Sequence, residues 1–193
     1  MDNINLDNFK GKSYRLANNW SYFIPLEDKP INYLEIGTFY GGNLISVSQT
    51  YGRHQDSKLY CIDPWKDYED YPEYKNEQDT IFSTFKYNIT TYDLDDKVTI
   101  IRGYSNEKVL TLEDNYFDII YIDGNHEPEY VLEDAVLCFR KLKVGGYLIF
   151  DDYGWCGPDL TQAGIDSFIK GYHKRIKLIN IDHNTQTFIQ KIK

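Results

Sequence analysis

Short apolar runs alternate with longer mixed segments along most of the chain. The apolar runs have the composition of strands, and they cover residues 31–36, 58–62, 98–101, 117–122 and 147–150. The clearest helical pattern begins near Pro128 and carries an apolar stripe made of Val131, Ala135, Cys138 and Leu142. Strands that alternate with helices are typical of βαβ units and a mostly parallel sheet.

The same patterns predict the remaining elements. Further helices are expected at residues 43–51, 78–90, 106–112 and 159–172. Near the C-terminus, residues 176–181 and 185–191 resemble a β-hairpin that turns at residues 182–184. We therefore predict an α/β fold that is Rossmann-like and doubly wound, with a mostly parallel seven-stranded sheet and a C-terminal antiparallel hairpin.

Glycines and prolines predict how several of these elements begin and end. Gly37 ends the first strand, and Asn43 is a candidate N-cap for the helix that follows. The pair Gly145–Gly146 is expected to close the helix that begins near Pro128. Residues 67–77 interleave tyrosines with acids and have no core period, so we interpret this segment as a loop or lid.

Composition narrows the class of protein. The 193 residues are 41% hydrophobic, and none of the apolar runs approaches the roughly 20 residues that cross a bilayer. The first ten residues lack a signal-peptide pattern, so a soluble cytoplasmic protein is expected. The net charge of −9 argues against nucleic-acid and membrane partners. The three cysteines lack paired spacing, which disfavours a zinc site or a disulfide framework.

Polar residues and glycines gather where the predicted strands end. In an open parallel sheet, ligands bind at the carboxyl ends of the strands, near the point where the strand order reverses. The residues that fall there are Gly37, Asp63, Tyr104, Ser105, Asp123, Asp151 and Asp152. This edge of the sheet is therefore the predicted functional site.

The turn Glu35-x-Gly37-x-x-x-Gly41 is the sharpest local signal at this edge. It is not the Gly-x-Gly-x-x-Gly turn that holds a pyrophosphate in nicotinamide-dependent oxidoreductases, which makes that class a poor match. An acid before the first glycine suits an ammonium group better than a phosphate, so the turn favours a ligand with an amino-acid tail. The alternative is an ordinary glycine turn between a strand and a helix.

This turn, the acids Asp63 and Asp123, and the pair Gly145–Gly146 resemble class I S-adenosylmethionine-dependent methyltransferases in order and spacing. The likeness covers residues 30–155. It implies one methyltransferase domain over residues 1–193: an N-terminal helical cap segment at 1–30, a cofactor-binding core at 31–155, and a C-terminal helix and hairpin at 156–193.

The resemblance also assigns residues to parts of the cofactor, S-adenosylmethionine. Asp63 would hold the ribose hydroxyls, although it could instead only initiate the Asp-Pro turn. Tyr104 and Ser105 would contact the adenine. The remaining implied cofactor-binding residues, most of them around the methionine part, are Glu35, Gly37, Thr38, Gly41, Asn43 and Asp123.

Segments 121–126, 142–146 and 151–153 resemble more narrowly the metal-assisted small-molecule O-methyltransferases, which include macrocin-type sugar methyltransferases and, more distantly, catechol-type enzymes. The resemblance implies a Mg²⁺ or other divalent-ion site made of Asp123, Asp151 and Asp152. Catechol-type enzymes carry Asp-Asn where this chain has Asp151–Asp152. In the metal-free alternative, Asp151 caps a loop and Asp152 faces water.

His126 follows Asp123 by three residues and is the candidate general base. The alternative is that His126 is an N-cap or a packed loop residue. We expect a small hydroxylated acceptor, preferably a sugar or glycosylated metabolite, and a homodimer is possible by the same resemblance. A metal-free N- or O-methyltransferase and a non-catalytic cofactor-binding paralogue remain alternatives.

Overall fold

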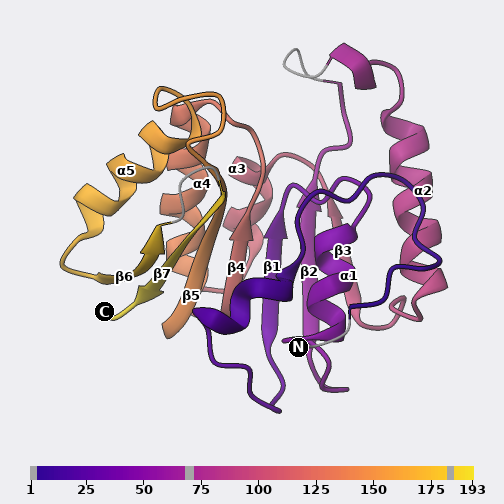
Figure 1. Cartoon of the computed structure of the whole chain (residues 1–193), viewed down its shortest axis with the longest axis horizontal. Coiled ribbons are helices and arrows are strands. Elements are labelled where there is room, and N and C mark those ends of the chain that lie inside the picture. Colours follow the sequence, from indigo (N-terminus) through magenta and orange to yellow (C-terminus); the bar gives the residue numbers. More distant parts are fainter. Residues whose placement is uncertain (1–3, 68–71, 182–184) are drawn as a thin grey trace.

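The computed structural model describes residues 4–67, 72–181 and 185–193, and its central feature is a seven-stranded sheet in the order β3-β2-β1-β4-β5-β7-β6 (Figure 1). Strands β1 to β5 are parallel, whereas β7 pairs antiparallel with both β5 and β6. The strands are Asn32–Ile36, Lys58–Asp63, Val98–Arg102, Phe117–Ile122, Leu142–Tyr153, Ile176–Ile181 and Thr185–Lys191, β1 to β7 in chain order. The predicted fold class is confirmed, and the strand order reverses between β1 and β4.

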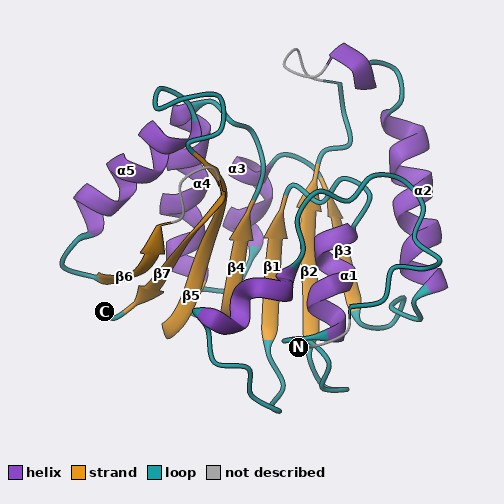
Figure 2. Cartoon of the chain, in the orientation of Figure 1, coloured by secondary structure: helices purple, strands orange, loops and turns teal. Residues whose placement is uncertain are grey.

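Helices cover both faces of the sheet (Figure 2). The α-helices α1 to α5 are Gly42–Gln49, Gln78–Thr91, Ser105–Lys108, Pro128–Lys141 and Thr161–Tyr172, and the 3₁₀ helices η1 to η3 are Ala17–Tyr22, Pro72–Tyr74 and Val109–Thr111. Neighbouring residues of one strand enter opposite cores, because side chains alternate along a strand. Tyr33 packs with α1 and α2, and Leu34 packs with α4 and α5.

Both cores bury a cysteine. Cys61 lies in the core beside α1 and α2, and Cys138 lies in the core beside α4 and α5. Their burial agrees with the prediction that these thiols act as small apolar side chains. Within the part of the chain that the structure describes, none of the helices is both long and apolar enough to cross a bilayer.

The structure corrects several predicted boundaries. Asn43 is not the N-cap of α1; Gly41 takes that position with a left-handed backbone (φ 87°). Gly145 and Gly146 do not close α4, which ends at Lys141, because β5 begins directly at Leu142. The glycines instead lie in an irregular stretch of β5, where the pairing with β4 shifts register between Phe117 and Ile119.

Other differences concern short segments. The helix predicted at 106–112 is α3 followed by the 3₁₀ turn η3. The described part of the predicted lid contains η2. The tyrosines and acids at 68–71 and the hairpin turn at 182–184 lie outside the described residues.

The N-terminal segment is packed onto the sheet and its helices. In Figure 1 this indigo segment runs beside α2, crosses above α1 and continues through η1 in front of the sheet. The backbone N–H and C=O of Lys10 bond to the Asn88 side chain on α2, and the Ala17 N–H donates to Ser46 on α1. Trp20 is fully buried and donates its indole N–H to Gln186 on β7. Ala17, Trp20 and Ile24 of the predicted cap segment are therefore part of the core beside α1 and α2.

Replacing Trp20 with Ala should lower the free energy of unfolding by about 3–5 kcal/mol, because it leaves a large cavity between η1 and β7. Urea unfolding followed by circular dichroism measures this change. Tyr22→Ala is the matched control, since Tyr22 belongs to the same turn and is 70% exposed. Equal losses in the two variants would show that the segment is not anchored by the indole.

Candidate functional site

The loops after β1 and β4 touch each other where the strand order reverses. Gly37 has a positive φ of 77°, and a Cβ at this position would overlap the carbonyl oxygen of Asp123. The Asp123 N–H in turn donates to the Ile36 carbonyl at 2.9 Å. Only glycine fits this contact, because any side chain would push the two loops apart. The glycine turn (residues 35–41) and Asp123 are therefore held side by side.

Asp63 ties this turn to the end of β2. Its Oδ2 accepts the backbone N–H groups of Thr38 and Phe39, both at 2.9 Å, and its Oδ1 accepts the Trp65 N–H at 2.7 Å. Burial raises the pKa of Asp63, and these three N–H bonds oppose the rise. The Trp65 bond initiates the Asp-Pro turn. Because a carboxylate has about four lone-pair positions, these three bonds leave one position on Oδ1 unused.

Glu35 lies beneath the same turn and is 1% exposed. Its Oε2 accepts the Tyr33 hydroxyl at 2.6 Å and the Asn43 amide at 2.9 Å. Burial raises the pKa of Glu35 to about 8, although these two hydrogen bonds lower it. A nearby ammonium group would favour the ionised form, so Glu35 is suited to a cationic ligand.

Two observations at the turn fit an absent ligand. The hydroxyl oxygen of Thr38 is buried beside Glu35 and Cys61, and none of the residues that the structure places completes a hydrogen bond of good geometry to it. Such a buried polar atom costs free energy unless a ligand satisfies it. Phe39 has φ 53° and Trp65 has φ 43°, and bulky residues rarely adopt this conformation. Backbone strain of this kind gathers at binding sites.

The residues predicted to contact adenine lie next to Asp63. The Gly103 N–H donates to the Asp63 carbonyl at 3.0 Å, which fixes the end of β3 beside the end of β2. Ser105 begins α3, and Tyr104 before it is 49% exposed. The Lys66 amine lies 5.3 Å from the centre of the Tyr104 ring. The structure therefore places the loop that carries Tyr104 and Ser105 beside the end of β2, with the Ser105 side chain hydrogen-bonded to Asp134 on α4.

Asp123, His126 and Asp152 form a compact cluster at the ends of β4 and β5. One ligand atom from each residue lies within 4.8 Å of the others. The His126 Nε2 atom is 3.3 Å from Asp152 Oδ2 and 3.9 Å from Asp123 Oδ1. The ring centre of Trp155 lies 4.9 Å from that of His126, edge to face. The cluster thus contains the predicted catalytic pair, His126 and Asp123, and two of the three predicted metal ligands, Asp123 and Asp152.

The conformation of Asp152 aims its side chain at this cluster. Its φ is 58°, and the pairing of β5 with β7 shifts register between Phe150 and Tyr153. Its carbonyl accepts the Trp155 N–H and the Thr161 hydroxyl, which hold the strained backbone in place. Burial raises the pKa of Asp152, and the Asp123 carboxylate raises it further.

Asp151, the third predicted metal ligand, is not among the residues whose ligand atoms lie within 4.8 Å of one another. Its carboxylate is 3% exposed, and its Oδ1 lies 3.6 Å from the Nε atom of Arg15 in the N-terminal segment. Burial raises the pKa of Asp151 to about 8, and the Asp123 and Asp152 carboxylates add to the rise. Arg15 was not predicted from the sequence, because nothing in its local pattern connects it to a residue so far along the chain.

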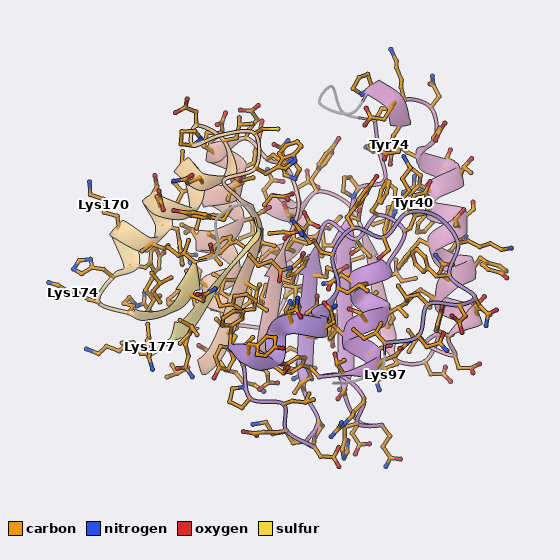
Figure 3. The ribbon with its side chains drawn as sticks, viewed as in Figure 1. Tyr40, Tyr74, Lys97, Lys170, Lys174 and Lys177 are labelled. Atoms are coloured by element: carbon orange, nitrogen blue, oxygen red, sulfur yellow. The ribbon has the colours of Figure 1, made fainter. Side chains whose placement is uncertain are left out.

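An aromatic group joins the N-terminal segment to the described part of the lid. The Tyr14 and Tyr74 hydroxyls are 2.9 Å apart, and the Lys12 amine donates to the same Tyr74 oxygen at 2.9 Å. The Phe39 ring packs edge-on against Tyr74 and against Tyr40. Figure 3 shows Tyr40 and Tyr74 on the same side of the molecule, near the carboxyl ends of the strands. Phe39 and Tyr40 belong to the glycine turn that the sequence singled out, and Tyr74 belongs to the predicted lid, so these contacts join the two segments.

Comparisons with known proteins identify the family of this chain. The chain matches a model described as a methyltransferase domain over residues 34–153. It is 32% identical over 131 residues to the uncharacterized protein R132 of Acanthamoeba polyphaga mimivirus; the match covers 66% of this chain and 53% of that protein. The chain therefore spans about half the length of this curated relative.

Solved structures agree with that assignment at the level of the fold. A Clostridium thermocellum protein proposed to be an rRNA methylase has a TM-score of 0.69 at 15% identity, with 94% of this chain and 99% of that chain covered. The O-methyltransferase TomG of Streptomyces achromogenes, solved with S-adenosylmethionine, has a TM-score of 0.64 at 17% identity, with 84% and 73% covered.

The family match spans β1 to β5 and contains the glycine turn, Asp63 and the Asp123–His126–Asp152 cluster. The chain therefore belongs to the methyltransferase domain family and has the fold of the class I S-adenosylmethionine-dependent methyltransferases.

Proposed function

We propose that this chain is an S-adenosylmethionine-dependent O-methyltransferase that acts on a small hydroxylated acceptor. The observation that carries the proposal is the position of the Asp123–His126–Asp152 cluster, directly beside the Gly37 turn at the point where the strand order reverses. One part of this edge suits the cofactor, and the adjoining part suits proton removal from an acceptor. A sugar or glycosylated metabolite is the preferred acceptor.

The cofactor side requires residues that bind and orient. S-adenosylmethionine supplies a methyl group on a sulfonium, which is already a good leaving group. Glu35 and Thr38 would bind the methionine part, Asp63 the ribose, and Tyr104 and Ser105 the adenine. Their task is to hold the methyl group in line with the acceptor oxygen, because correct alignment supplies much of the rate.

The acceptor side must remove a proton from the hydroxyl group. His126 is placed to accept it, and Asp152 at 3.3 Å orients the imidazole and stabilises its charged form. A divalent ion held by Asp123 and Asp152 would lower the pKa of the same hydroxyl. In a metal-free enzyme, His126 alone would take the proton.

RNA is the main competing acceptor, because the Clostridium thermocellum protein covers nearly the same length. The net charge of −9 disfavours it, since phosphate binding depends on clustered Lys and Arg. Figure 3 shows Lys170, Lys174 and Lys177 along the outer edge by α5 and β6. This edge is at the opposite end of the sheet from β2 and β3, so these lysines lie far from the residues proposed to bind the ribose and the adenine. We therefore favour a small molecule.

Titration with S-adenosylhomocysteine tests the cofactor site. We expect micromolar binding, about −8 kcal/mol, and at least about a tenfold loss in Asp63→Ala. The 2′-deoxy analogue of the ligand separates a ribose contact from a loosened turn: it should bind more weakly than the parent to the wild type and equally to the variant. Asp159→Ala is an exposed control. If Asp63→Ala still bound the parent more tightly than the 2′-deoxy analogue by the wild-type factor, Asp63 would not be the residue that binds the ribose.

Glu35 gives the ligand-free protein a distinctive pH dependence. Its folded-state pKa of about 8 exceeds the ordinary value of about 4.3, so the folded chain holds a proton that the unfolded chain releases. Stability without ligand should therefore fall as the pH rises between these values. Glu35→Gln cannot ionise, so its fall should be smaller, while its affinity for S-adenosylhomocysteine should drop.

Urea unfolding at about pH 5 and about pH 8 measures this difference, with Glu129→Gln on the exposed side of α4 as the control. Identical pH slopes in the wild type and Glu35→Gln would contradict the assignment of a buried, protonated carboxyl.

His126→Ala should slow methyl transfer by about 10²-fold or more, while S-adenosylhomocysteine binds as in the wild type. Production of S-adenosylhomocysteine with a panel of sugars and other hydroxylated acceptors measures the rate. His173→Ala is the control, because His173 lies at the exposed end of α5. Full activity in His126→Ala would end the proposed role in proton removal.

A further inference from the structure

We propose that Asp123, His126 and Asp152 together form the ion site of this chain, and that the imidazole makes the site select a first-row transition-metal ion over Mg²⁺. This ligand set differs from the three aspartates that the sequence predicted. The inference deepens the proposed function. When the ion is bound, His126 is one of its ligands and the ion lowers the pKa of the acceptor hydroxyl, so the imidazole accepts the proton only in the ion-free chain. Only this catalytic use rests on the proposed function; ion binding itself stands on the cluster.

The spacing of the donor atoms suits one ion. With bonds of about 2.1 Å, an octahedral ion places neighbouring ligand atoms about 3.0 Å apart and opposite ones about 4.2 Å apart. The distances from His126 Nε2 to the two carboxylate oxygens, 3.3 and 3.9 Å, lie between these values. All three donor atoms lie within 4.8 Å of one another. The cluster therefore requires little rearrangement to bind an ion.

The orientation of His126 supports a ligand role. Its Nε2 atom faces both carboxylates, and its side chain is only 14% exposed, with Trp155 against the ring. Two carboxylates also neutralise the charge of a divalent ion. The cluster residues are partly exposed rather than sealed, so water or an acceptor hydroxyl has room to complete the coordination.

Arg15 separates Asp151 from this site. The guanidinium is 3.6 Å from Asp151 Oδ1, and that carboxylate is 3% exposed. The Arg15 side chain is 39% exposed, but its guanidinium would still repel a divalent ion bound to the same carboxylate, because the two charges would lie close together. Asp151 and Asp152 are adjacent in β5, and the left-handed backbone of Asp152 (φ 58°), at the register shift between Phe150 and Tyr153, directs its side chain to His126. Asp152 therefore joins His126, and Asp151 joins Arg15.

The ligand types set the ion preference. Mg²⁺ strongly prefers oxygen ligands and keeps several waters. An imidazole nitrogen suits ions such as Co²⁺, Fe²⁺ and Zn²⁺ better, and affinity for a mixed nitrogen and oxygen site rises along the first row. One nitrogen and two carboxylates therefore favour these ions.

The experiment is calorimetric titration of the full, untagged chain with Co²⁺ and with Mg²⁺, with the visible absorption of bound Co²⁺ as a spectroscopic readout. We expect Co²⁺ to bind at least tenfold more tightly than Mg²⁺. His126→Ala should weaken Co²⁺ binding at least tenfold, shift the Co²⁺ absorption bands and remove the preference. Asp152→Asn should weaken both ions.

Two further variants are the controls. The double variant R15Q/D151N removes the Arg15–Asp151 pair without leaving either charge alone, and it should keep the wild-type Co²⁺ affinity within threefold. His173→Ala should bind both ions as the wild type does. Circular dichroism melting of each variant separates lost binding from lost folding.

Three results would overturn the inference: Co²⁺ affinity unchanged in His126→Ala, Co²⁺ affinity lost in R15Q/D151N, or binding of neither ion to the wild type. Titration with S-adenosylhomocysteine in the same samples keeps the two proposals distinct. Cofactor binding without ion binding would reject the ion site alone. Ion binding without cofactor binding would reject the proposed function and leave the ion site standing.

Discussion

The packing of Gly37 against the Asp123 carbonyl is the contact on which the rest of the site depends. It occurs where β1 and β4 lie side by side, which is the point at which the strand order reverses. Because no Cβ separates the two loops, the glycine turn (residues 35–41) and the Asp123–His126–Asp152 cluster meet at the carboxyl ends of the strands. A larger residue at position 37 would have to move Asp123, so the cofactor side and the acceptor side could not both keep their geometry.

Several carboxylates are buried at this end of the sheet, and a different kind of partner offsets the cost of burying each one. Asp63 accepts three backbone N–H groups, Glu35 accepts a hydroxyl and an amide, and Asp151 pairs with Arg15. Burial disfavours the charged form in every case, so a cationic ligand would relieve part of the cost. The ligand-free site is therefore less stable than an apolar one would be, which is common where binding matters more than stability.

Much of the fold followed from local patterns, because a half-buried strand and an amphipathic helix each leave a period in the sequence. Strands β1 to β4, α2, α4, α5 and the C-terminal hairpin were predicted to within a few residues, whereas β5 was predicted only at 147–150 and spans Leu142–Tyr153. The errors fell where tertiary contacts overrode local signals. Gly145–Gly146 looked like a helix end, yet pairing with β4 and β7 draws both glycines into β5. Asn43 looked like an N-cap, yet its amide is used to bind Glu35.

The sequence by itself determined which chemical groups stand at the ends of the strands, because a strand and the residues that follow it are contiguous in the chain. Glu35, Asp63, Asp123 and His126 were found in this way. Only the tertiary structure decided which of these side chains lie together. Arg15 and Asp151 are far apart in sequence and meet because the N-terminal segment crosses above α1. Asp151 and Asp152 are adjacent, but the left-handed backbone of Asp152, at the irregular pairing of β5 with β7, directs its side chain to His126 instead.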